Sequence, residues 1–319
     1  MLSRFRFVAV AVVAGLMLSS CAPPVSTAPP AGATGPSPGC GVTTRGPVNE
    51  RSEKIKAAGA VRTYRLTVPK NHVAGTSDPI PLVLDFHGLL EGWVGTHPYS
   101  TQFSALAQKE GFAAVFPVGS QNGIHWNVNL TETNSDLRFI DALLEHLEST
   151  MCIDRSRVYI TGLSYGASMT SMLMCMRANT FAAAAPVAGM MNPCTRTERA
   201  VPFVTFHGDA DWILPFAFFK DTPGAVAAKY GCEPDPVVTT LSPNPDPVTR
   251  GPITKTTWNC DAVGSAAEFY IIGGGGHSWP GSKFFTQIEG IVGKTASSID
   301  ATEIIWDFFS QHRLPDAPA

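Results

Sequence analysis

Short apolar runs and longer amphipathic stretches alternate along most of this chain. From residue 61, the segment VRTYRLTV alternates apolar and polar residues with period two, which predicts a half-buried strand at a sheet edge. Six further runs are almost continuously apolar, as is typical of strands that are covered on both faces. They are residues 81–88, 112–118, 157–162, 182–189, 202–208 and 268–274.

Helical patterns separate these runs. Residues 135–150 (SDLRFIDALLEHLEST) have helical periodicity, and residues 300–312 open with the capping-box spacing of Asp300 and Glu303. Strands and helices that alternate in this way predict one α/β domain, with a mainly parallel central sheet and helices on both faces. In such sheets, functional sites gather at the carboxyl ends of the strands.

The N-terminus has the pattern of an export signal. Arg4 and Arg6 precede an apolar run from Phe7 to Leu18, which is too short to span a bilayer. The following Leu-Ser-Ser-Cys sequence resembles a bacterial lipobox, in which the cysteine, here Cys21, carries a diacylglyceryl group. We therefore predict a lipoprotein signal peptide over residues 1–20 and a lipid anchor on the outer face of the bacterial cell membrane. Simple secretion is the alternative.

Two segments rich in proline divide the rest of the chain. Residues 22–39 contain six prolines, three glycines and no charged residue, so residues 21–40 are predicted to be an extended stalk. Residues 41–319 are predicted to form the folded domain. A second proline-rich stretch, residues 233–252, is predicted to be a surface excursion within that domain.

Charge and cysteine content narrow the classes of function. The net charge of −3 and the charged fraction of 15% argue against nucleic-acid binding. With Cys21 lipidated, six cysteines remain, and an even number in an exported protein predicts disulfides. We expect Cys232–Cys260, which closes the excursion. Cys152 and Cys175 are expected at one sheet edge, which leaves Cys40 and Cys194 as the third pair.

The candidate chemistry begins at Gly162-Leu163-Ser164-Tyr165-Gly166, which fits the Gly-x-Ser-x-Gly pattern between a strand and a helix. Small residues two before and two after the serine allow a sharp, strained turn that exposes its hydroxyl. The helix N-terminus then offers free amides to an oxyanion. The two donors are predicted to be the N–H groups of Tyr165 and of Leu89, which follows His87-Gly88 on another strand end.

A serine nucleophile needs a base and an acid, which follow it in this fold in the order acid, then histidine. Of the eight histidines, His277 has the suitable place, because it lies on a glycine-rich loop past the last strand. Asp209 and Asp211 both follow a strand and both precede His277, so spacing leaves the acid open. Aromatic residues flank the site as packing residues or as contacts for an acyl group: Trp126, Trp212, Phe216, Phe218, Phe219 and Trp279.

Together these motifs resemble the poly(3-hydroxybutyrate) depolymerase-like esterases of the α/β-hydrolases, a family that includes feruloyl esterases and bacterial lipoprotein esterases. The resemblance covers residues 64–314 and rests on LDFHG, GFAAVFPVG, CIDRSRVYITGLSYGASM, HGDADWILPF and GGGGHSWPG. It implies Ser164 as nucleophile, His277 as base and Asp211, the last residue of its His-Gly-x-x-Asp pattern, as acid. It also implies ester hydrolysis through an acyl-enzyme, with no metal or cofactor.

Two departures from that family limit the choice of substrate. Leu89-Leu90-Glu91 stands where many members have a small residue followed soon by glutamine, so the acyl preference stays open. Because the sequence ends soon after the final helix, we expect no appended polymer-binding module, and insoluble polyester is therefore a disfavoured substrate. We expect a monomer that acts on small or oligomeric esters. The alternatives are a non-catalytic binding lipoprotein and a serine peptidase or acyltransferase with the same triad.

Overall fold

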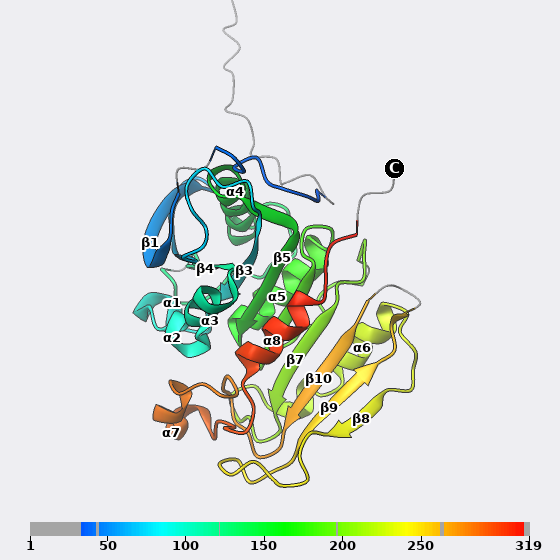
Figure 1. Cartoon of the computed structure of the whole chain (residues 1–319). Coiled ribbons are helices and arrows are strands. Elements are labelled where there is room, and N and C mark those ends of the chain that lie inside the picture. The colour runs from blue at the N-terminus through cyan, green and yellow to red at the C-terminus, as the bar shows by residue number, and fades with distance from the viewer. Residues whose placement is uncertain (1–32, 43–44, 121, 196, 262–264, 316–319) are drawn as a thin grey trace, which may run out of the picture.

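The structure is a computed structural model, shown in Figure 1, and it describes residues 33–42, 45–120, 122–195, 197–261 and 265–315. The predicted signal peptide and Cys21 lie outside these residues. The described residues form a ten-stranded sheet in the order β1-β2-β4-β3-β5-β6-β7-β10-β9-β8. Among them, no helix has both the length and the apolar character needed to cross a bilayer.

The six strands from β4 to β10 in this order are parallel, and the outer strands at both margins pair antiparallel. This arrangement confirms the predicted mainly parallel centre. The bounds are β1 (Val48–Ala57), β2 (Ala60–Val68), β3 (Ile80–Phe86), β4 (Ala113–Pro117), β5 (Ile153–Leu163), β6 (Ala183–Val187), β7 (Phe203–Gly208), β8 (Val237–Thr240), β9 (Ile253–Trp258) and β10 (Ala267–Ile272).

Helices cover both faces of the sheet, as predicted. The longer ones are α3 (Phe103–Glu110), α4 (Ser135–Thr150), α5 (Tyr165–Met176), α6 (Thr222–Lys229) and α8 (Ala301–Ser310). The short ones are α1 (Glu91–Val94), α2 (His97–Thr101) and α7 (Glu289–Val292). Apolar residues of α4, α5 and α6 share one core, and those of α3 and α8 share the other.

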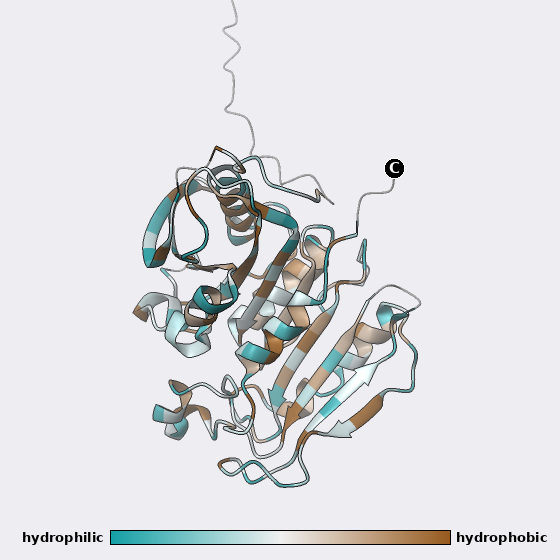
Figure 2. Cartoon of the chain, in the orientation of Figure 1, coloured by the Kyte–Doolittle hydropathy of each residue, from teal (hydrophilic) through white to brown (hydrophobic). Residues whose placement is uncertain are grey.

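Successive side chains of each strand point to opposite faces of the sheet, so the parallel strands contribute residues to both cores. Leu82 and Leu84 of β3 enter the core under α4 and α5, whereas Val83 between them enters the core under α3 and α8. Figure 2 shows the corresponding apolar colouring of the central strands, in contrast to the polar β1. Burial on both faces explains why these strands read as continuous apolar runs in the sequence.

Two predicted helices have the expected start sites. α4 spans the predicted residues 135–150, and the Asn134 side chain accepts the N–H groups of Asp136 and Leu137. α8 begins after Asp300, whose carboxylate accepts the N–H groups of Thr302 and Glu303. Both side chains satisfy amides that have no partner within their helix.

The margins of the sheet differ from the prediction. β2 is not the edge strand, because β1 pairs with it on the outer side. The sequence of β1, VNERSEKIKA, is rich in charged residues and therefore lacks the apolar signal of a strand. The proline-rich stretch 233–252 likewise contains an exposed edge strand, β8, which pairs with β9.

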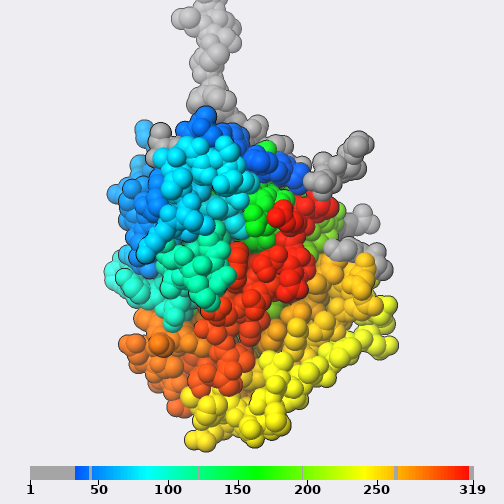
Figure 3. Space-filling model, in the orientation of Figure 1, coloured from blue at the N-terminus to red at the C-terminus, as the bar shows by residue number. Residues whose placement is uncertain are grey.

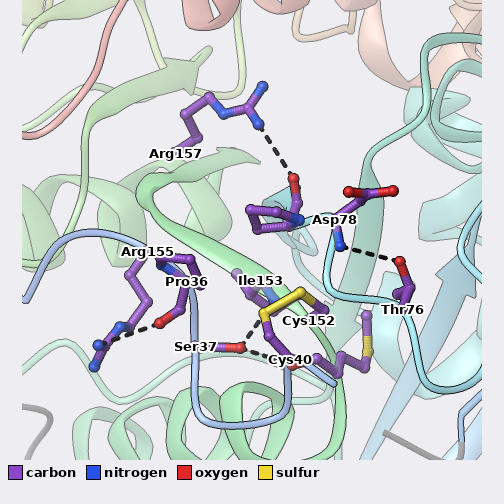
Figure 4. The surroundings of a disulfide bond; sticks show 11 residues. Pro36, Ser37, Cys40, Thr76, Asp78, Cys152, Ile153, Arg155 and Arg157 are labelled. Atoms are coloured by element: carbon purple, nitrogen blue, oxygen red, sulfur yellow. Dashed lines mark hydrogen bonds between the residues drawn. A yellow bond between two sulfur atoms is a disulfide. The ribbon is translucent and has the colours of Figure 1, made fainter. Parts of the chain in front are cut away.

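The six cysteines within the described residues all form disulfides, but two of the three pairings differ from the expectation. Cys232–Cys260 is confirmed. Cys152 pairs with Cys40 rather than with Cys175, because residues 35–40 pack along the start of β5 (Figure 4). Cys175 pairs with Cys194, since the connection between β6 and β7 returns along α5. The Met191 N–H on this connection donates to Ser171 Oγ of α5.

The last residues of the predicted stalk are part of the folded domain. Pro36 forms a β-bridge with Asp154, and Ser37 Oγ donates to the Met151 carbonyl oxygen at 2.7 Å. These contacts fix the chain at the amino ends of the parallel strands. In the space-filling view, the blue N-terminal segment lies opposite the yellow and orange loops that extend beyond the carboxyl ends (Figure 3).

Candidate active site

Ser164 occupies a strained backbone position between β5 and α5. Its φ of 59° and ψ of −114° lie outside the regions that non-glycine residues normally adopt. A Cβ atom at Gly162 would lie 2.6 Å from the Phe86 carbonyl oxygen, and one at Gly166 only 1.8 Å from it. Both glycines are therefore needed for β3, β5 and α5 to approach one another, which confirms the steric interpretation of the motif.

The serine lies at the N-terminus of α5. Ser164 is half-buried, and the neighbouring Tyr165 is exposed. Tyr165 is the first residue of α5, so its N–H has no acceptor within the helix. That amide and the positive end of the helix dipole lie beside the serine, where an oxyanion would form.

His277 and Asp211 are in direct contact. His277 Nδ1 lies 2.7 Å from Asp211 Oδ2, and both side chains are buried. Asp211 lies three residues after the end of β7, and His277 lies on the loop after β10. β7 and β10 are parallel neighbours in the sheet, which brings the ends of these loops together.

Asp211 is held as a carboxylate by several donors. Its Oδ1 accepts the N–H groups of Ile213 and Leu214, and its Oδ2 lies 3.3 Å from His207 Nε2 as well as near His277. Burial alone would raise the pKa of Asp211, but the hydrogen bonds from His207 and His277 outweigh it and hold the pKa well below its usual range. An ionised acid can orient the imidazole and stabilise its protonated form.

Asp209 has a different role in the structure. It is exposed, and its Oδ1 accepts the N–H of Gly274 at 2.6 Å, which ties the turn after β7 to the glycine-rich loop. Sequence spacing did not separate the two aspartates, whereas the contact geometry pairs Asp211 alone with His277. His207, near the end of β7, also contacts the Asp211 carboxylate. Its four-residue spacing from Asp211 was the available signal for this contact.

The glycine-rich loop is packed too tightly for side chains. The His277 N–H donates to the Val292 carbonyl oxygen, and the Gly276 N–H donates to that of Lys294. A Cβ atom at Gly276 would lie 2.2 Å from the Val292 oxygen. The glycines therefore let this loop lie against residues 292–294, which holds the imidazole in place rather than leaving it free to swing.

Ser164 and the Asp211 turn are neighbours through Gly189. The position of a Cβ on Gly189 lies 3.4 Å from Ser164 Cα and 3.2 Å from Leu214 Cδ1. Leu214 in turn donates its N–H to Asp211. Among the described residues, no hydrogen bond joins Ser164 Oγ to His277, so the serine–histidine step belongs to the proposal below.

The predicted oxyanion loop adjoins the serine. The Phe86 and His87 carbonyl oxygens lie against Gly166 of α5. Trp126 Nε1 donates to the His87 oxygen at 2.9 Å, and His87 Nε2 accepts the Gly119 N–H at 3.0 Å. Burial lowers the pKa of His87 to about 4, so this ring is neutral and can act as that acceptor. Leu89 is 52% exposed at the surface of the loop.

The flanking aromatic residues fall into two groups. Trp126 and Trp279 are buried packing residues, whose indole N–H groups bond His87 and Thr302. Trp212 is 62% exposed and Phe218 is 80% exposed. Further large exposed apolar side chains lie on the loops and short helices that follow the carboxyl ends of the strands, among them Leu90, Trp93, Val94, Ile124, Leu130, Met191, Ile213 and Ile291.

The described residues contain no group of three or more histidine, cysteine, aspartate or glutamate side chains arranged to hold a metal ion. The Asp211 carboxylate is instead bonded to His277, His207 and two backbone amides. The arrangement thus offers an imidazole–carboxylate pair, a serine on a strained turn and backbone amides, which are the parts that acyl transfer requires.

Comparison with known proteins agrees with this chemistry. The profile of the prolyl oligopeptidase family matches residues 99–213. A probable feruloyl esterase C of Aspergillus niger is 29% identical over 178 residues, which cover 54% of this chain and 63% of that protein. The chain thus spans somewhat less than two thirds of this relative. Feruloyl esterase D of Neurospora crassa is 27% identical over 230 residues, covering 66% of this chain and 73% of that protein.

Two further matches span more of the chain. A putative esterase, NocK, of Nocardia uniformis is 25% identical over 343 residues, covering 96% of this chain and 98% of that protein. The solved structure of an acetyl xylan esterase from Aspergillus awamori superposes with a TM-score of 0.56 at 16% identity, covering 75% of this chain and 98% of that chain. The chain has the α/β-hydrolase fold, as the sequence predicted.

Proposed function

We propose that this protein is a serine carboxylic-ester hydrolase in which Ser164 is the nucleophile, His277 the base and Asp211 the acid. The observation that carries the proposal is the buried contact of 2.7 Å between His277 Nδ1 and Asp211 Oδ2, on loops that adjoin the strained turn of Ser164. The esterases among its relatives support the same reaction class.

In the first half of the reaction, Ser164 Oγ attacks the ester carbonyl carbon while His277 Nε2 takes the hydroxyl proton. Asp211 accepts a hydrogen bond from His277 Nδ1–H and stabilises the resulting imidazolium. The negative charge on the carbonyl oxygen is met by the N–H groups of Leu89 and Tyr165. His277 then gives its proton to the leaving alkoxide, which departs as an alcohol and leaves an acyl-serine.

In the second half, water replaces the alcohol. His277 Nε2 takes a proton from the water as its oxygen attacks the acyl-serine carbonyl, and the same two amides stabilise the second oxyanion. Collapse of this intermediate breaks the bond to Ser164 Oγ, which recovers a proton from His277. The products are a carboxylic acid and the free enzyme, so no metal or cofactor enters the reaction.

The surroundings of the site indicate the kind of ester. Exposed apolar side chains such as Trp212 and Phe218 stand on the loops around Ser164 and suit an apolar or aromatic acyl group. We propose feruloyl esters first among the candidates, because two relatives of the chain are named feruloyl esterases. We propose a monomer that acts on small or oligomeric esters.

We place this activity outside the cytoplasm. Three disulfides are typical of proteins that fold in an oxidising compartment. The predicted signal and the lipobox at Cys21 add a lipid anchor in the membrane to this proposal.

A comparison of Ser164→Ala with wild type tests the function. With the full-length protein, p-nitrophenyl acetate, methyl ferulate and a hydroxybutyrate oligomer serve as substrates. Wild type is expected to hydrolyse at least one of them, and Ser164→Ala to fall to background. Ser168→Ala, one turn further along α5, is the matched control and should retain the wild-type rate. Equal rates for wild type and Ser164→Ala would instead favour a non-catalytic binding protein.

A serine peptidase is the second candidate, because the matching profile is that of the prolyl oligopeptidase family. The same triad can cleave amides when the leaving amine is protonated by His277. Parallel assays with a prolyl p-nitroanilide and the p-nitrophenyl ester distinguish the two. We expect a value of kcat/KM for the ester far above that for the anilide, and the reverse order would assign the protein as a peptidase.

A further inference from the structure

A cluster of charged side chains lies buried beneath the predicted oxyanion loop, outside the triad. His97, at the start of α2, lies between two carboxylates: its Nε2 is 2.8 Å from Asp85 Oδ1 and its Nδ1 is 3.1 Å from Glu91 Oε2. Asp85 belongs to β3 and Glu91 begins α1. All three side chains are buried.

His97 and Glu91 are both ionised at neutral pH. Burial alone would lower the pKa of His97, but the charges of Asp85 and Glu91 outweigh it and raise the pKa to about 10. Burial likewise opposes the ionisation of Glu91, yet His97 and the hydrogen bonds from Ser100 and Gly88 lower its pKa to about 2. His97 is thus a fixed cation with both ring nitrogens donating, and it has no lone pair to act as a base.

Glu91 connects this cluster to the loop backbone. Its Oε2 accepts the Gly88 N–H at 2.7 Å, and its Oε1 accepts the Ser100 hydroxyl at 2.6 Å. The Gly88 amide is therefore already occupied and is not available to a substrate. Among the described residues, no backbone acceptor is recorded for the next amide, that of Leu89.

The same loop is strained and lies against the serine turn. Leu90 has a φ of 68°, a left-handed conformation that a leucine adopts only when its surroundings impose it. The Leu90 N–H donates to the Ile124 carbonyl oxygen. A Cβ atom at Gly88 would lie 2.8 Å from Glu91 Oε2 and 3.5 Å from the Leu163 carbonyl oxygen, next to Ser164.

We propose that Glu91, held by His97 and Asp85, is a positioning residue for the oxyanion hole. By accepting the Gly88 N–H, its carboxylate fixes the peptide orientation of the loop and leaves the Leu89 N–H free to donate to the developing oxyanion. This inference rests on the proposed hydrolase function. It also gives a role to Glu91 at the point where the sequence departs from the pattern of the family that it resembles.

The His97 cation matters because of where the carboxylates lie. Two unpaired negative charges beneath an oxyanion would oppose its formation. One imidazolium between them compensates one of these charges and supplies a hydrogen bond to each carboxylate. With His97 protonated between the carboxylates, Glu91 can hold the loop as a charged acceptor while opposing the formation of the oxyanion less strongly.

Two variants of Glu91 separate positioning from a general loss of structure. Glu91→Ala removes the acceptor of the Gly88 N–H, and kcat is expected to fall by about 10²–10³-fold, the usual effect of losing one oxyanion donor. KM should change only a few-fold, because the contact matters chiefly in the transition state. In Glu91→Gln the amide oxygen can accept the Gly88 N–H while its NH2 faces the Ser100 hydroxyl. This variant should therefore recover kcat to within about tenfold of wild type.

Glu53→Ala is the matched control. Glu53 lies on β1, away from the site, and its carboxylate bonds Tyr64 and Arg51. Burial alone would raise its pKa, but hydrogen bonds from Arg45 and Tyr64 outweigh burial and lower the pKa to about 2, as in Glu91. The Glu53→Ala variant should have a lower melting temperature than wild type but the same kcat. All assays are made below the melting temperature of each variant.

The outcomes also separate the two proposals. An active wild type whose kcat is unchanged in Glu91→Ala overturns the positioning role alone, as does a loss that Glu91→Gln fails to recover. A wild type no faster than Ser164→Ala overturns the proposed function, and the positioning role with it. A fall in kcat for Glu91→Ala, with recovery in Glu91→Gln and no change in Glu53→Ala, supports both.

Discussion

Two histidines in this protein contact buried carboxylates, and their surroundings give them opposite properties. His277 contacts Asp211 through Nδ1 at 2.7 Å. His97 contacts Glu91 through Nδ1 and Asp85 through Nε2, at 3.1 Å and 2.8 Å. Both lie near the carboxyl ends of the parallel strands, on opposite sides of the strand that leads to Ser164.

The two histidines differ in how many of their ring nitrogens contact a carboxylate. For His277, no hydrogen bond to Nε2 is recorded within the described part of the chain, so this nitrogen is available to take a proton. For His97, both nitrogens face carboxylates and the ring stays protonated. A carboxylate partner therefore does not by itself make a histidine a base. One ring nitrogen must be left without a partner.

The largest effect that this comparison predicts is on kcat, when His277 and its available Nε2 are removed. His277→Ala is expected to lower kcat by about 10⁵–10⁶-fold, as the removal of a triad base does elsewhere. Its free energy of unfolding should change much less than its rate. Initial rates and urea unfolding measured on the same preparations test both statements. A residual rate within a hundredfold of wild type would mean that another group is the base.

The next effect concerns the partner of that histidine. Asp211→Asn keeps the shape of the side chain but favours the wrong tautomer of His277, and kcat is expected to fall by about 10⁴-fold. Asp209→Asn is the control, since the Asp209 side chain bonds the Gly274 N–H rather than His277, and this variant should change kcat less than tenfold. Rates for the two variants with one ester substrate provide the test. Equal losses would show that the contact geometry has assigned the acid wrongly.

His97→Gln should show the opposite balance of activity and stability. The glutamine removes the cation between two buried carboxylates, which is expected to lower the free energy of unfolding by about 3–5 kcal/mol. Through the loop, kcat should fall by about 10²-fold, far less than in His277→Ala. Urea unfolding monitored by tryptophan fluorescence measures the first effect. Unchanged stability would argue against a charged His97.

The smallest effect is a pH dependence of stability. Between pH 7 and pH 10, His97 is protonated in the folded protein, because Asp85 and Glu91 raise its pKa to about 10 against burial, but it is neutral in the unfolded chain, where its pKa is 6.5. Its stabilising contribution, complete below pH 6.5, is then lost at about 1.4 kcal/mol per pH unit as the pH rises. The difference in unfolding free energy between wild type and His97→Gln should shrink at that rate. A constant difference would contradict the raised pKa.

The sequence alone predicted the candidate residues Ser164 and His277, but it did not predict the buried cluster around His97. Gly-x-Ser-x-Gly and the glycine-rich loop before His277 are short local patterns that identify strand ends, and Ser164 and His277 lie there. Asp211 needed a family resemblance, because Asp209 has the same local setting. In the structure, it is Asp211 and not Asp209 that is buried and contacts His277.

The Glu91 cluster had no local signal of this kind. Its three charged side chains come from β3, α1 and α2, and only the folded loop shows that they share hydrogen bonds. Isolated polar residues between apolar runs are normally expected to face solvent. The sequence did show that Leu89-Leu90-Glu91 was unusual, but not that Glu91 accepts the Gly88 N–H.

In the fold, too, some elements could be predicted from the sequence and others could not. Strands buried on both faces, such as β3 and β4, were predicted because almost all of their residues are apolar. β1 and β8 were missed because they lie at the margins, where backbone pairing rather than side-chain burial defines a strand. The pairs Cys40–Cys152 and Cys175–Cys194 depend on how irregular segments return across the domain, which no periodicity records.

The attachment of residues 36–40 at the start of β5 gives the molecule a defined polarity (Figure 4). β5 runs from that attachment, beside Cys152, to the turn of Ser164 at its other end. Any surface that holds this protein by its first described residues would therefore leave the turn of Ser164 directed outward, toward molecules arriving from the surroundings. A tether at this end needs no further hinge to leave the hydroxyl within reach of a large substrate.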